Sequence, residues 1–93
     1  MTHEIKINQC YADAILDGRK NFEVRLNDRG YNAGDKVVFH VYNDGFHCNL
    51  HGLENRAYEI TYVHSGLGTA EGYVVFGIKE IGGENGKVRD NQN

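Results

Sequence analysis

The amino-acid sequence predicts an α+β fold that is mainly β: a small barrel of five or six strands with one short helix near the N-terminus. Three features predict it. Several short segments alternate apolar and polar side chains, as half-buried strands do. One early segment repeats its apolar residues at helical spacing. The strand segments are evenly spaced, which favours a barrel over an open sheet with bare edges.

The first strand and the helix come at the start of the chain. Residues 4–8 alternate, with Ile5 and Ile7 on one face. Asn8 is a suitable N-cap for the helix that follows, and Gly18 stands where a left-handed C-terminal cap is expected. The apolar residues of this helix are Tyr11, Ala14 and Ile15. We therefore expect a helix of about two and a half turns.

The second strand, residues 21–27, has a period of two. We expect its apolar row to face the core: Phe22, Val24 and Leu26. We expect its polar row to face the other way: Asn21, Glu23, Arg25 and Asn27. Residues 27–30, Asn-Asp-Arg-Gly, then end the strand in a turn.

Further strands complete the predicted sheet. Residues 36–42 are apolar on one face and largely covered on the other, and Asn-Asp-Gly at 43–45 indicates a hairpin with residues 46–51 as its return strand. Residues 73–81 form the most hydrophobic segment. Residues 56–64 alternate again, and their apolar side is expected to consist of Tyr58, Ile60 and Tyr62.

The 93 residues are expected to form one domain over residues 1–81. Residues 82–93 contain a single aliphatic residue, Val88, which cannot offset the entropy of ordering the segment. They are predicted to be a disordered tail.

Composition limits the classes of function. The net charge of −3 argues against coating nucleic acid by charge alone, although it permits a focused site. We expect no signal peptide and no membrane-spanning segment, because the apolar stretches are far shorter than the roughly 20 residues that cross a bilayer. Cys10 and Cys48 are read as free thiols in a reducing compartment. We therefore expect a cytoplasmic monomer that does not bind membranes.

Positive charge is concentrated in residues 18–30, GRKNFEVRLNDRG. This segment holds four cations, Arg19, Lys20, Arg25 and Arg29, but only two carboxylates, Glu23 and Asp28. On an acidic chain, such a local excess indicates where an anionic ligand would bind.

The same segment carries a recognisable motif, G-x-K-x-x-E-x-R, at Gly18, Lys20, Glu23 and Arg25. It resembles the motif of ASCH domains, which belong to the PUA-like superfamily. The sequences FEVR and NDR, the pair Gly34-Asp35 and the closing EGYVVFGI extend the similarity over residues 2–81. Together they resemble a compact bacterial and phage subfamily of unsettled function.

The resemblance implies a small PUA-like mixed β-barrel with a cleft beside the motif that binds RNA or a nucleotide. We assign the ligand-binding role to Lys20, Glu23, Arg25, Asp28 and Arg29. An arginine oriented by a carboxylate two positions away can grip a phosphate in bidentate fashion. A base-stacking ring is also expected, and the sequence leaves it open among Tyr42, Tyr58, Tyr62 and Tyr73.

Other functions remain open. A hydrolase acting on a modified nucleoside or on RNA would use Lys20 and Glu23 as acid and base. Glu23, however, occupies the place of the nucleophilic threonine of related amidohydrolases, and Glu71 is only a loose match for their later glutamate, so binding is favoured over catalysis. A protein-interaction module of a mobile element is a further alternative. So is a structural role, with Glu23 and Arg25 as a surface ion pair worth about 0–1 kcal/mol.

Two other segments are interpreted as having no chemical role. His47-Cys48 with His51 has zinc-like spacing but lacks a second half, and His40 and His64 lie on strands that need not point there. We therefore expect no metal ion and no cofactor. The Gly-rich residues 65–72 lack the features of a phosphate loop and are expected to form a rim of the cleft.

Overall fold

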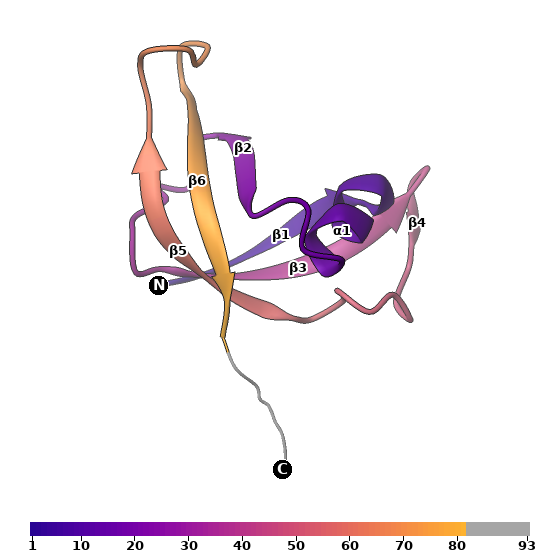
Figure 1. Cartoon of the computed structure of the whole chain (residues 1–93). Helices are drawn as coiled ribbons and strands as arrows, with labels where there is room; N and C mark the ends of the chain where they lie inside the picture. The colour runs from indigo at the N-terminus through magenta and orange to yellow at the C-terminus, as the bar shows by residue number, and fades with distance from the viewer. Residues whose placement is uncertain (82–93) are drawn as a thin grey trace.

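Six strands and one helix follow one another along the chain in the computed structural model, which describes residues 1–81 (Figure 1). The predicted tail, residues 82–93, lies outside the described residues. The α+β, mainly β fold with a short N-terminal helix is confirmed. The elements are β1 (Thr2–Asn8), α1 (Gln9–Leu16), β2 (Phe22–Leu26), β3 (Lys36–Asn43), β4 (Phe46–His47), β5 (Ala57–His64) and β6 (Tyr73–Glu80).

The strands form one curled sheet, a half-barrel, in the order β1-β3-β5-β6-β2, with β4 paired to β3. β1 and β3 are parallel, and the other pairs are antiparallel. The curl brings the two end strands, β1 and β2, toward each other. Arg25 Nη2 donates to the Lys6 carbonyl at 2.6 Å, and Arg29 Nη1 donates to the Glu4 carbonyl at 3.0 Å. Side chains thus bridge the gap between the end strands.

The core fills the concave side of the sheet. The predicted inward rows of β1 and β3 are buried, and β6 adds a third row. Each fully buried aliphatic or aromatic side chain contributes about 1.5–3 kcal/mol relative to exposure. The main core residues of these strands are Ile5, Ile7, Val37, Phe39, Val41, Val74, Phe76 and Ile78.

Helix α1 begins and ends as the sequence predicts. The Asn8 side chain accepts a hydrogen bond from the Cys10 N–H at 3.0 Å, and Gly18 has a φ of 84° after the last turn. The buried face consists of Ala12 and Ile15, while Tyr11, predicted to be apolar core, is exposed. Among the described residues, no helix is long and apolar enough to cross a membrane.

Strand β2 is oriented opposite to the prediction. Its residues Glu23 and Arg25 lie opposite the core residues Phe76 and Val74 of β6, so they share the inner face. The apolar row, expected in the core, is exposed: Phe22, Val24 and Leu26. A period of two tells which residues share a face but not which face is buried. Here β6 already fills the core, and the inner row of β2 faces the gap toward β1.

Two further predictions need correction. Tyr62 of β5 was expected on the apolar side with Tyr58 and Ile60, but a shift in strand register between Ile60 and Tyr62 turns it outward, and it is exposed. The hairpin at 43–45 is confirmed, with a φ of 52° at Asp44. Its return strand is shorter than predicted, because β4 contains only Phe46 and His47.

Candidate functional site

A cleft of about 530 Å³ opens between the two end strands of the sheet. Its walls come from residues 6–8 of β1, Tyr11 of α1, Lys20, all five residues of β2, and Tyr73 of β6. Because β2 is an end strand, the cleft reaches side chains of both its polar and its apolar row. This cleft contains the centre of the basic segment noted in the sequence.

The charged part of the cleft is built around Glu23, whose side chain is only 5% exposed. Arg25 Nε donates to Glu23 Oε1 at 3.0 Å, and Lys20 Nζ donates to Glu23 Oε2. Lys20 Nζ also donates to the Phe22 carbonyl at 2.6 Å. Each carboxylate oxygen therefore has its own cationic partner. With two cations and one anion, the cluster retains one net positive charge.

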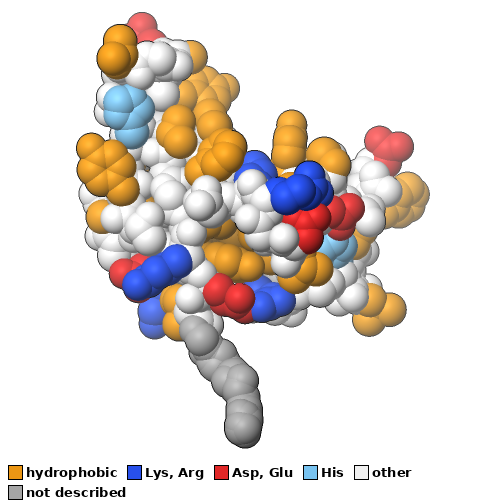
Figure 2. All heavy atoms as spheres, viewed as in Figure 1, with side chains coloured by type: hydrophobic (Ala, Val, Ile, Leu, Met, Phe, Trp, Pro, Cys, Tyr) orange, Lys and Arg blue, Asp and Glu red, His pale blue; other side chains and the backbone are white. Residues whose placement is uncertain are grey.

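The apolar part of the cleft consists of aromatic rings next to this charge. Lys20 Nζ lies 5.5 Å from the centre of the Tyr11 ring and 5.0 Å from that of Phe22, within cation–π range. Tyr11, Phe22 and Tyr73 are all partly exposed. Figure 2 shows hydrophobic side chains gathered over β5, β6 and β2, beside Lys and Arg side chains near α1.

The predicted ligand-binding residues divide into two groups. Lys20, Glu23 and Arg25 meet in the cleft. Asp28 and Arg29 lie exposed in the turn after β2, outside the residues that line the cleft. Arg29 instead contacts the β1 backbone, and Arg25 does so in addition to its contact with Glu23. The arginines therefore help to close the half-barrel.

Of the four tyrosines proposed for stacking, Tyr73 lines the cleft. Tyr58 is buried, and burial raises its pKa. Sequence reasoning missed Tyr11 and Phe22 because it assigned both to the core. Phe22 could have been found from its position close after the motif lysine, whereas Tyr11 lies on the preceding helix and is brought to Lys20 only by the fold.

The Gly-rich connection between β5 and β6 lines a different hollow from this cleft. Ser65, Thr69 and Glu71 line a separate hollow of about 460 Å³. None of residues 65–72 lines the cleft itself, although Tyr73 lines both hollows. Glu71, the loose match to a catalytic glutamate, lines this other hollow and not the cleft that contains Lys20.

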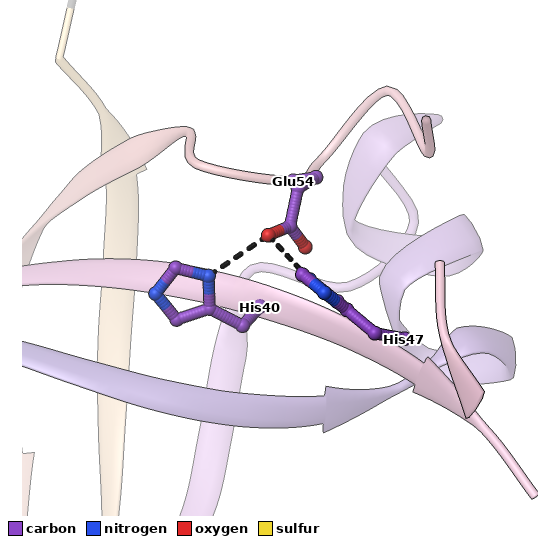
Figure 3. Close-up of side chains that lie close together, drawn as sticks. All are labelled: His40, His47 and Glu54. Carbon is purple, nitrogen blue, oxygen red and sulfur yellow. Dashed lines mark hydrogen bonds and ion pairs between the residues drawn. The ribbon is translucent and has the colours of Figure 1, made fainter. Parts of the chain in front are cut away.

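A second cluster joins two histidines to Glu54, whose side chain is 5% exposed (Figure 3). His40 Nδ1 lies 2.9 Å from Glu54 Oε2, and His47 Nε2 lies 2.7 Å from the same oxygen. One potential ligand atom from each residue lies within 4.8 Å of the others. The predicted zinc-like triplet contributes only His47, since His51 Nε2 instead pairs with Asp13 Oδ1 at 2.7 Å.

Hydrogen bonds set the charge state of this cluster. Burial raises the pKa of Glu54, but hydrogen bonds from His40, the Val41 N–H and His47 outweigh it and lower the pKa to about 2. The hydrogen bond to Glu54, followed by that to Glu4, raises the pKa of His40. Glu54 is therefore a carboxylate that accepts hydrogen bonds from these neighbours.

Comparison with known proteins gives two results. Residues 2–78 match the family described as Domain of unknown function (DUF3850). An uncharacterized 12.9 kDa protein from the GpA 3′ region of Escherichia phage P2 is 40% identical over 43 residues, which is 46% of this chain. The aligned segment spans 39% of the phage protein. The predicted similarity to a phage protein of unsettled function is thus supported.

Proposed function

The chain belongs to the DUF3850 family, and from the cleft within its matched region we propose that it binds a nucleotide, either free or within single-stranded RNA. One observation carries this proposal. A cluster with net positive charge and three partly exposed aromatic rings share one cleft. A nucleotide offers the matching chemistry, because it combines a phosphate with a flat base.

The cationic side chains supply the phosphate contact. Arg25 donates from Nε to Glu23 and from Nη2 to the Lys6 carbonyl. The remaining N–H groups of its guanidinium are available to an anion. The buried carboxylate of Glu23 fixes the positions of Lys20 and Arg25, so little side-chain entropy is lost when a phosphate binds. The resemblance of this motif to that of ASCH domains supports the same ligand class.

The rings supply the base contact. Phe22 and Tyr73 project from the outer face of adjacent strands near opposite ends of β2, with Leu26 directly across from Tyr73. Stacking on an aromatic side chain is worth about 1–3 kcal/mol per base and tolerates any base. We therefore expect binding with weak sequence preference and a marked dependence on salt.

The proposal is tested by fluorescence anisotropy with labelled single-stranded RNA, using unlabelled ribonucleotides as competitors. Phe22→Ala should weaken binding by about 5- to 150-fold, because one stacking platform is lost. Tyr62→Ala is the matched control, since it removes an exposed ring on β5 outside the cleft. The proposal is wrong if the wild-type protein binds neither RNA nor a ribonucleotide at millimolar concentration. If it instead captures a protein partner, the interaction-module alternative gains support.

The charge contribution is tested separately by Lys20→Met, with Arg19→Met as its neighbouring control. Arg19 is exposed and pairs with Asp17 at 2.8 Å, outside the cleft. Lys20→Met should weaken RNA binding and reduce the slope of log K against log salt by about 0.7. Equal losses in both variants would mean that the cleft does not provide the phosphate contact.

A further inference from the structure

We propose that His40, His47 and Glu54 bind one divalent transition-metal ion, and that zinc fits the site best. The three residues come from β3, β4 and the turn before β5. None of them lines the nucleotide cleft, so this site is independent of the proposed function.

The first argument is convergence. His40 Nδ1 and His47 Nε2 approach the same carboxylate oxygen, Glu54 Oε2, at 2.9 and 2.7 Å (Figure 3). Zinc binds imidazole nitrogen and carboxylate oxygen at about 2.0–2.2 Å, which places tetrahedral ligand atoms roughly 3.3 Å apart. Binding of an ion would lengthen the two N···O separations by a few tenths of an ångström and bring the two imidazole nitrogens, which lie within 4.8 Å of each other, to a similar spacing.

The second argument is that each ligand is held in place by another group. The Val41 N–H donates to Glu54 Oε1 at 2.7 Å, leaving Oε2 for the cluster. His40 Nε2 lies 2.8 Å from Glu4 Oε1, so with its proton on Nε2 the ring turns the Nδ1 lone pair toward the ion. Metal-binding histidines usually donate their other ring N–H to an acceptor, and a carboxylate is one of the common ones.

The third ligand, His47, is oriented by stacking. Its ring lies 4.9 Å from that of Tyr42 with an interplanar angle of 18°, and Lys6 Nζ lies 5.0 Å above Tyr42. The His47 side chain is 43% exposed, whereas that of Glu54 is 5% exposed. The site is thus anchored on its buried side and accessible from solvent on the other.

The ligand set indicates the type of metal site. Two histidines and one glutamate are a known zinc combination that leaves a fourth position for water or another ligand. Within residues 1–81, two further carboxylate–histidine pairs lack a second imidazole: His3 with Asp35 at 2.9 Å, and His51 with Asp13 at 2.7 Å. They provide internal controls for adventitious binding.

The test titrates the full chain with Zn²⁺ by isothermal calorimetry, and with Co²⁺ by its visible absorption. Wild-type protein should bind one ion per chain. His47→Ala should weaken binding by more than about 100-fold, and Glu4→Gln, which loses the carboxylate behind His40, by about 10-fold. His51→Ala should leave the affinity unchanged. His47 lies on the two-residue strand β4, so its replacement should preserve the fold, as circular dichroism will verify.

The proposal is overturned if wild-type protein does not bind either ion, if His47→Ala retains the wild-type affinity, or if His51→Ala loses as much. Should His47→Ala fail to fold, the imidazole nitrogen spectra of the wild-type protein decide instead. Zinc must then shift His40 Nδ1 and His47 Nε2, and shifts confined to other histidines would reject the site.

Discussion

Glu23 and Glu54, two glutamates whose carboxylates have little exposure to solvent, are each paired with two basic side chains, but the basic groups differ in kind. Glu23 is paired with Lys20 and Arg25, whereas Glu54 is paired with His40 and His47. Lysine and arginine normally keep their protons at neutral pH, whereas imidazole exchanges its proton near neutrality and binds metals when neutral. The first cluster therefore presents lasting positive charge, and the second presents lone pairs that a metal ion can share.

The difference also appears in the surroundings. The Glu23 cluster lies beside exposed aromatic rings in a cleft, which suits a ligand with both phosphate and base. The Glu54 cluster lies between β3, β4 and a turn, where hydrogen bonds and ring stacking fix each residue. Two clusters built around a carboxylate are thus suited to different ligands, because the basic residues around the carboxylate differ.

The largest expected effect on stability is that of Glu23→Gln. It leaves two largely buried cations without their counter-ion, so the free energy of unfolding should fall by about 3 kcal/mol in urea denaturation. Asp17→Asn, at an exposed ion pair with Arg19, should cost much less. If the two variants lose the same amount, the Glu23 cluster is only a surface ion pair.

Zinc should stabilise the protein through Glu54 and not through Glu23. At a zinc concentration about 100 times the dissociation constant, the free energy of unfolding should rise by about 2.7 kcal/mol, and a chelator should reverse the rise. Glu23→Gln should keep this increment, while Glu54→Gln should lose most of it. Thermal unfolding with and without zinc provides the measurement, and an equal increment in Glu54→Gln would refute the distinction.

A smaller effect tests the orientation of β2. Phe22→Ala should lower the free energy of unfolding by about 1 kcal/mol or less, because the ring is 42% exposed. Phe76→Ala, on the paired strand, removes a fully buried ring and should cost about 3–5 kcal/mol. Chemical denaturation of both variants decides. Comparable losses would place the apolar row of β2 in the core.

The smallest effect concerns pH and a third carboxylate, Asp35. The hydrogen bond from His3, followed by those from the Asn32 N–H and the N-terminus, lowers its pKa against the opposing effect of desolvation. A lowered folded-state pKa gives stability that is present above the unfolded value of 3.8 and disappears as pH falls through the folded value. The difference in unfolding free energy between wild type and Asp35→Asn should therefore shrink as the pH falls below about 4. A difference that grows in acid would contradict this assignment.

The sequence predicts most of the framework. Alternation places Ile5 and Phe39 inside correctly, and the capping residues Asn8 and Gly18 bound the helix. Alternation does not indicate which face of an end strand is buried. The sequence therefore predicts the apolar row of β2 in the core, whereas the structure exposes it. Alternation also cannot foresee the register shift that turns Tyr62 outward.

Site prediction was limited in the same way. Lys20, Glu23 and Arg25 are close in sequence, so a local motif identifies them. His40 and Glu54 are separated by a hairpin and a turn, and only the folded chain brings them to His47. Glu54 gives no signal in a loop of ordinary composition, because its partners are defined by strand pairing rather than by spacing.

The central claim, that the cleft between β1 and β2 binds a nucleotide, is tested most directly by amide chemical-shift mapping of ¹⁵N-labelled protein titrated with short single-stranded RNA. The claim predicts shifts concentrated at residues 20–26, Lys6 and Tyr73, with the amides of His40, His47 and Glu54 changing little. Saturating RNA that leaves these cleft amides unshifted, or shifts only amides elsewhere, would contradict it.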